Sequence, residues 1–238
     1  MSGTDERVAL AAVFADLVAV QVAPFGIPDL AQRLVDGCVD VLDVWAAGLL
    51  VTDPGSTPKV LASSTHEAGL LELVQVRSGQ GPCLAAIATG EVVAVDDVTA
   101  MTEVWPQWTA SAAALGIRRA YGIPLRAQGE VVGALNLFRT DRGPLAASDV
   151  SVAVSLADVA TVGILQHRAM EQANGLALQL QRALESRVVI EQAKGALAER
   201  ADISVAEAFV RLRSHARQTS RPLGEVATAV VEGTLDLS

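Results

Sequence analysis

One stretch decides the first half of the fold: IRRAYGIPLRAQGEVVGALNLFR, residues 117–139. It contains two apolar runs, 117–125 and 131–139, which are separated by the short turn Ala127-Gln128-Gly129. Runs of this length around a glycine-containing turn predict a hairpin of two central strands. The alternation of apolar and polar residues is imperfect, which indicates that both faces of the sheet are covered.

Shorter elements extend outward from this hairpin. Strands are expected at residues 46–51, 60–63 and 92–95, the first two separated by the turn Asp53-Pro54-Gly55. Helices are expected at residues 5–20, 29–42, 67–74, 81–88 and 104–115. Strands interspersed with helices predict the α+β class, with one antiparallel sheet and helices packed on its faces.

From Asp149 onward the strand signal disappears. Apolar residues recur at helical spacing as far as Arg200, which predicts one long helix. A bend in this helix is expected near Asn174-Gly175. Its apolar stripe changes sides. Residues Ala173, Leu176, Leu180 and Ala183 lie opposite the stripe of Val189, Ala193 and Leu197.

The upstream stripe has the three- and four-residue spacing of a two-helix seam, so these four residues predict a homodimer contact. The alternative interpretation is one helix wrapped by two domains. Downstream, Ser204 and Glu207 fit a capping box at the start of a second helix, and Pro222 suits the first turn of a third. The result is an all-α bundle of three helices.

Charge is unevenly distributed along the chain. The net charge is −9 for 238 residues, but residues 182–221 carry 8 Lys and Arg against 5 Asp and Glu. A locally basic surface is therefore expected near the C-terminus. Neither a signal peptide nor a long uninterrupted apolar run is evident, so a cytoplasmic protein without a membrane partner is predicted.

The C-terminal residues resemble a known family. The run SRVVIEQAKGALAER, residues 186–200, followed by SVAEAFVRLR, residues 204–213, is similar to the ANTAR domain. The resemblance implies a three-helix unit that binds RNA stem-loops and acts in transcription antitermination. The candidate RNA-binding residues are Arg187, Gln192, Lys194, Arg200, Arg213 and Arg217. An ion pair of Glu191 with Arg187 and Lys194 is the structural alternative.

The first part of the chain resembles a GAF domain. The similar segments are VRSGQGPC at residues 76–83, ATGE at 88–91, and GIPLR at 122–126 continuing to GEVVGALNLF at 129–138. The resemblance implies a sensor with a small-molecule pocket between sheet and helices. Leu137 stands where the cyclic-nucleotide signature has lysine, so that ligand class is not favoured. The candidate pocket residues are Met101, Trp105, Trp108 and Tyr121.

Together these features predict an N-terminal helix (1–26), a GAF-like sensor domain (27–167), a helical linker (168–183) and an ANTAR domain (184–238). Catalytic residues, metal ligands and a cofactor are not expected, apart from an unknown small-molecule effector. The only cysteines, Cys38 and Cys83, lie on different elements, so redox catalysis is disfavoured and buried thiols are expected. A DNA-binding repressor, or a sensor and interaction dimer without nucleic acid, are the alternative functions.

Overall fold

The computed structural model describes residues 3–22, 26–53, 55–127, 129–141 and 143–237. They form two compact units, Met1–Arg168 and Ala169–Ser238. Of the two predicted turns, Pro54 and Gln128 lie outside the described residues. The glycines that follow them, Gly55 and Gly129, have positive φ angles of 74° and 85°, as tight turns require.

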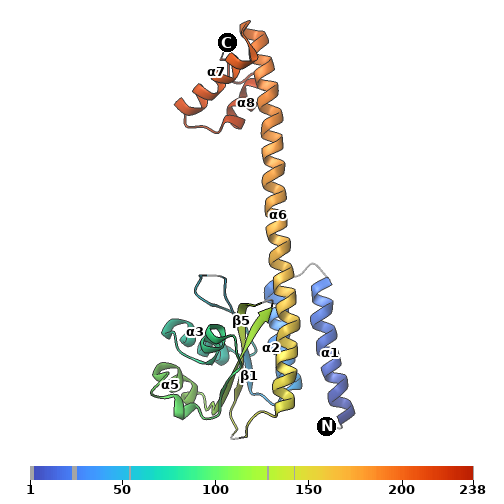
Figure 1. Ribbon diagram of the computed structural model, residues 1–238, viewed down its shortest axis with the longest axis vertical. Helices are drawn as coiled ribbons and strands as arrows, with labels where there is room; N and C mark the ends of the chain where they lie inside the picture. The colour runs from blue at the N-terminus through green and yellow to red at the C-terminus, as the bar shows by residue number, and fades with distance from the viewer. Residues whose placement is uncertain (1–2, 23–25, 54, 128, 142, 238) are drawn as a thin grey trace. The chain divides into compact units, whose positions relative to one another are not determined.

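The first unit is built on a five-stranded antiparallel sheet (Figure 1). In spatial order its strands are β2 (Lys59–Ser63), β1 (Ala46–Val51), β5 (Glu130–Arg139), β4 (Arg119–Ala127) and β3 (Val93–Val95). The predicted hairpin is the pair β4–β5, whose register is shifted by a bulge between Leu125 and Arg126. The α+β class predicted from the sequence is therefore confirmed.

Helices cover both faces of this sheet. One face carries α2 (Ile27–Val41) and the first part of α6 (Ala147–Ala201), and α1 (Gly3–Val22) packs on the outer side of these two helices. The other carries α3 (His66–Ser78), α4 (Pro82–Thr89) and α5 (Pro106–Ala114), with a 3₁₀ turn, η1 (Val98–Met101), before α5. Leu135 and Leu137 of β5 face the first layer, whereas Ala134 and Phe138 face the second. Both sides of β5 are thus apolar, which explains the imperfect alternation.

Two glycines allow this second layer to approach the sheet. A Cβ atom at Gly122 of β4 would lie 2.4 Å from the carbonyl oxygen of Pro82, at the start of α4. A Cβ atom at Gly48 of β1 would lie 2.3 Å from a carboxylate oxygen of Glu72 in α3. A side chain at either position would therefore displace a helix or the buried acid.

Helix α6 runs for 55 residues without interruption. Within the first unit its inner side is fully buried and joins the core; these residues are Ala153, Leu156, Ala157, Ala160 and Ile164. By length and composition alone, α6 is the one helix in the described part of the chain that could cross a membrane. That apolar character coincides with the core side chains just named.

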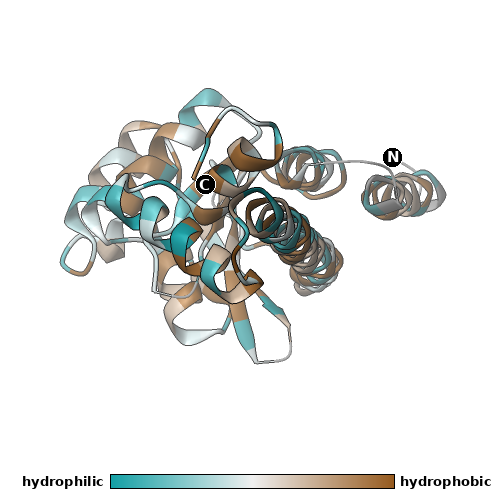
Figure 2. Cartoon of the chain, turned by 90° about the horizontal axis from the view of Figure 1, so that it is seen from above, coloured by the Kyte–Doolittle hydropathy of each residue, from teal (hydrophilic) through white to brown (hydrophobic). Residues whose placement is uncertain are grey.

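The second unit contains the end of α6 together with α7 (Val205–Gln218) and α8 (Leu223–Val231). The three helices share one core, made by Ala193, Leu197, Ala208, Leu212, Ala216, Val226, Ala227 and Val230. Ala193 and Leu197 belong to the downstream stripe predicted from the sequence. Most helices in Figure 2 carry both hydrophobic and hydrophilic residues, as expected of helices with one buried side.

Candidate nucleic-acid interface and sensor core

Two tight turns position the helices of the C-terminal bundle. Asp202 and Ser220 have φ angles of 50° and 52°, left-handed conformations that end α6 and α7 within a residue or two. Ser204 caps α7, since its hydroxyl oxygen accepts a hydrogen bond of 3.1 Å from the Glu207 N–H. The other half of the predicted capping box is not formed, because the Glu207 carboxylate lies 3.8 Å from Arg211 instead.

Lys194 is held against its own bundle. Its ammonium group donates to both carboxylate oxygens of Glu191, each at 2.8 Å, and lies 5.5 Å from the centre of the Phe209 ring. Only 17% of its side chain is exposed. The charge of Lys194 is therefore already compensated by an anion and an aromatic face.

Arg200 also has a partner inside the bundle. One of its guanidinium nitrogens donates a 3.0 Å hydrogen bond to the carbonyl oxygen of Val230, at the C-terminal end of α8. Unpaired carbonyls at a helix end attract such donors. This contact ties the end of α6 to α8, so Arg200 has a structural role in the bundle.

The remaining candidates for RNA contact differ from these two. Arg187 and Gln192 on α6, and Arg213 and Arg217 on α7, are exposed. Within the described ranges, none of the four has a hydrogen bond or an ion pair through its side chain. Arg213 and Arg217 are one turn apart, so both project from the same side of α7. By contrast, Arg211 and Arg221 pair with Glu207 and Glu225.

The four residues of the predicted dimer seam are all exposed in the single chain. Leu176 and Leu180 are each 57% exposed, and Leu184, one turn beyond Leu180, is 65% exposed. A row of exposed leucines on one side of a helix is unusual unless another surface covers it. The seam itself remains a prediction.

Three of the four candidate pocket residues of the sensor domain lie together, and the fourth does not. Trp108 is fully buried beneath the sheet with Phe138 and Leu71, and Trp105 packs on it edge to face with ring centres 5.7 Å apart. Tyr121 belongs to the core on the opposite face, where its hydroxyl oxygen accepts a 2.8 Å hydrogen bond from the Leu145 N–H. Met101 lies with the tryptophans, so Tyr121 is the member that the structure separates.

A buried carboxyl group lies on the same side of the sheet as the tryptophans. Glu72 of α3 accepts hydrogen bonds from the side-chain amides of Asn136 (2.7 Å) and Gln75 (2.8 Å), and Gln75 in turn accepts one from the Cys83 N–H (3.1 Å). Burial raises the pKa of the Glu72 carboxyl to about 8, although both amides lower it. At neutral pH the group is therefore mostly protonated.

Both cysteines are buried free thiols, on opposite faces of the sheet. Burial raises the pKa of Cys38 to about 12, and burial together with the charge of Glu72 raises the pKa of Cys83. A thiol with a raised pKa carries little thiolate, which is the reactive form. Their separation and chemistry agree with packing roles.

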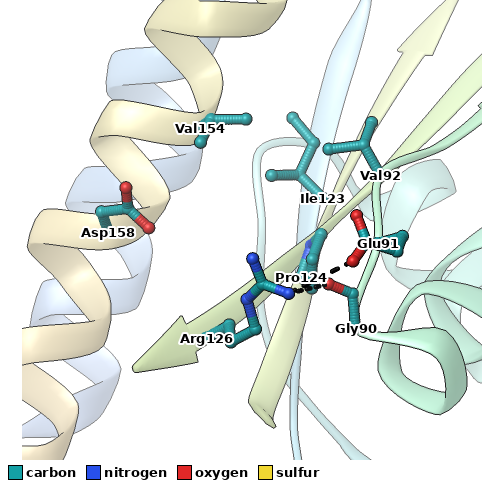
Figure 3. A pocket seen from close by; sticks show the side chains of 8 residues that line it. All are labelled: Gly90, Glu91, Val92, Ile123, Pro124, Arg126, Val154 and Asp158. Carbon is teal, nitrogen blue, oxygen red and sulfur yellow. Dashed lines mark hydrogen bonds and ion pairs between the residues drawn. The ribbon is translucent and has the colours of Figure 1, made fainter. Parts of the chain in front are cut away.

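A cavity of about 330 Å³ opens on the α6 side of the sheet edge (Figure 3). It is lined by residues from β4, from α6 and from the segment between α4 and β3. Neither this cavity nor the burial of Glu72 was predicted from the sequence. The cavity depends on residues far apart in the chain, such as Arg126 and Asp158, and the burial of Glu72 depends on Asn136. Neither feature has a local sequence motif.

The comparisons with known proteins agree with this geometry. Residues 26–164 match the family model of the GAF domain, and residues 178–231 match that of the ANTAR domain. A GAF domain from an Acinetobacter phosphoenolpyruvate-protein phosphotransferase is 14% identical with a TM-score of 0.54, covering 71% of this chain and 97% of that one. A GAF domain from the Coxiella burnetii phosphotransferase is 18% identical with the same TM-score, covering 69% of this chain and 98% of that one.

A domain of a putative two-component sensor histidine kinase from Sinorhizobium meliloti 1021 has a TM-score of 0.53 at 17% identity, covering 63% of this chain and 98% of that one. At these identities the structures show the fold alone. No curated protein matches the chain.

The two family matches define a regulatory protein with a sensor-type domain and a helical output domain. Because the GAF match spans more than half of the residues, the chain belongs to the GAF domain family. With its C-terminal ANTAR domain, it has the GAF–ANTAR architecture predicted from the sequence.

Proposed function

We propose that this protein is a transcription antitermination regulator that binds RNA stem-loops through its ANTAR domain and senses a small molecule through its GAF domain. The observation that carries the RNA-binding part is the set of exposed arginines without a partner in the described bundle: Arg187, Arg213 and Arg217. Exposed guanidinium groups suit phosphate oxygens, which they bind in a bidentate manner.

Buried polar atoms support the sensor part of this proposal. Trp108 Nε1, Thr109 Oγ1 and Asn136 Oδ1 are buried and have no hydrogen-bond partner in the described residues. All three lie in the layer formed by the sheet with α3, α4 and α5. Buried polar groups are nearly always paired in proteins. A polar ligand group entering this layer would satisfy them, and native mass spectrometry of the purified protein would detect such a ligand.

We further propose a cytoplasmic homodimer that is not an enzyme, with functional boundaries at 1–26, 27–167, 168–183 and 184–238. The exposed leucines at the predicted seam support the dimer, since two copies of α6 would cover each other's apolar side. The raised thiol pKa values of Cys38 and Cys83 support a non-redox role.

The decisive experiment is to sequence the nucleic acid that copurifies with the full-length protein and to measure its binding at several salt concentrations. We expect RNA with a paired stem. The Arg213→Ala/Arg217→Ala double variant should bind roughly tenfold more weakly or worse. It should also reduce the slope of the salt dependence by about 0.7 to 0.9 for each lost phosphate contact, the lower value applying to single strands and the higher to a duplex.

The Arg33→Ala/Arg77→Ala double variant is the matched control, because it removes two exposed arginines, from α2 and α3, in the first unit. An equal loss in this control would indicate a general charge effect and contradict the assignment of the RNA surface. Enrichment of duplex DNA would support a DNA-binding repressor. Absence of any nucleic acid would support an interaction dimer, which the net charge of −9 also suits.

A further inference from the structure

The cavity of about 330 Å³ lies entirely within the first unit, on the face of the sheet opposite the buried Glu72. Figure 3 shows side chains of β4 and α6 pointing into it from two sides, with the residues before β3 on the third. Its volume is at the lower end of the range for small-molecule sites. It is therefore large enough for a compact organic ligand.

The cavity has an apolar part and a charged part. Val154 of α6 and Val92 form the accessible apolar part, in which Val92 is 40% exposed, and the fully buried Ile123 of β4 lies behind them. Arg126, Glu91 and Asp158 form the charged part, with Asp158 one turn after Val154 on α6. A ligand that fills both would need an apolar body with a polar head.

The charges in the cavity are not balanced. Arg126 donates from Nη1 to the carbonyl oxygen of Gly90 at 3.1 Å and to the Glu91 carboxylate at 3.3 Å. Arg126 and Glu91 thus compensate each other. Asp158 is exposed, and its carboxylate has no hydrogen bond or ion pair with any residue that the structure describes. One negative charge at the edge of the cavity is left over.

We propose that this cavity binds a small organic cation, with its ammonium group on Asp158 and its apolar body against Val154 and Val92. An anionic head is disfavoured, because the unpaired Asp158 would repel it and Arg126 is already occupied. The ligand contacts α6 directly, through two residues one turn apart. The site differs from the sensor layer proposed above, which lies across the sheet.

The test uses the full-length protein and two probes of similar size and opposite charge, 3-phenylpropylamine and 3-phenylpropanoate. Isothermal titration calorimetry at constant ionic strength should show saturable binding of the amine and not of the carboxylate. In Asp158→Asn, amine binding should weaken roughly tenfold, the effect of losing one charge-assisted hydrogen bond. Asp5→Asn removes the same charge from the exposed side of α1 and should leave binding unchanged.

Because Asp158 is exposed, its replacement by asparagine should leave the fold intact, and circular dichroism would verify this. Three outcomes would overturn the proposal: tighter binding of the carboxylate, unchanged amine binding in Asp158→Asn, or no saturable amine binding at millimolar concentrations. The last includes the case in which a second copy of the chain covers the cavity. None of these outcomes bears on RNA binding, which the copurification experiment tests separately.

Discussion

The two units of this protein differ in which side chains they bury and which they expose. The first unit buries an acid, since Glu72 has no exposed surface and its hydrogen bonds come from Asn136 and Gln75. The second unit leaves leucines exposed, with Leu176 and Leu180 more than half accessible on α6. The first unit thus encloses even a polar group in its core, whereas the second exposes an apolar side of α6 that the predicted dimer seam would cover.

The largest expected effect tests the completeness of the first core. Leu156→Ala, on the buried side of α6, should lower the free energy of unfolding by roughly 2–5 kcal/mol, because it leaves a cavity among fully buried neighbours. Leu178→Ala, on an exposed part of the same helix, should change it by less than about 0.5 kcal/mol. Urea denaturation of both variants measures the contrast. Equal effects would mean that exposure in the single chain does not reflect the folded protein in solution.

The second prediction concerns the buried acid. The pKa of Glu72 is raised from 4.5 to about 8, so the folded state retains a proton that the unfolded state releases. The stabilising contribution of this group is complete below pH 4.5 and is lost as the pH rises towards 8, a loss of a few kcal/mol by order of magnitude. Denaturation midpoints across this range should show the decline in the wild type and a flatter profile in Glu72→Gln. If the wild type and Glu72→Gln showed the same dependence of stability on pH between pH 5 and pH 8, Glu72 would not be a buried neutral acid.

The third prediction tests the predicted dimer seam on α6. Leu180→Lys should raise the dimer dissociation constant by roughly tenfold to a hundredfold, because each copy loses the burial of one leucine. Leu178→Lys is the matched control, since Leu178 is 54% exposed but projects from the other side of α6. Sedimentation equilibrium distinguishes the two variants. A wild-type protein that is monomeric at micromolar concentration would disprove the seam.

The smallest expected effect concerns the difference between a paired and an unpaired basic residue in the second unit, Lys194 and Arg213. Lys194→Ala should leave the salt dependence of RNA binding almost unchanged, because Glu191 and Phe209 already hold its charge. Arg213→Ala should reduce the slope by about 0.7 to 0.9, the range for one phosphate contact with a single strand or a duplex. Filter binding over a salt series measures both slopes. Equal reductions would show that Lys194 leaves Glu191 to contact RNA.

Local sequence patterns were sufficient to predict the main helices and strands, but not every helix boundary or short turn. The hairpin of residues 117–139 and the long helix were predictable, because periodicity along the chain is set by the element itself. The helix expected from Val104 begins at Pro106 instead, where proline suits the first helical position. The preceding turn η1 has no apolar period and was not predicted.

Contacts between distant residues were not predictable. Glu72 looks like a surface residue of an amphipathic helix, and its burial depends on Asn136, 64 positions away, and on the missing side chain of Gly48. The sequence predicted that Tyr121 shares a pocket with the tryptophans, but its position in β4 turns its side chain to the other face of the sheet. For the RNA surface, the charges of the arginines were visible in the sequence, but the partners that occupy Lys194 and Arg200 were not.

The glycine at position 122 has a consequence for how the first unit can deform. Because Gly122 has no side chain, the backbone of β4 lies directly against the backbone of α4 at Pro82. No flexible side chain lies between the two elements to adjust when one of them moves. The next residue along β4, Ile123, belongs to the core on the other face and lines the cavity beside α6. Because β4 packs directly against helices on both faces, we expect a displacement of the strand towards one layer to require adjustment of the other.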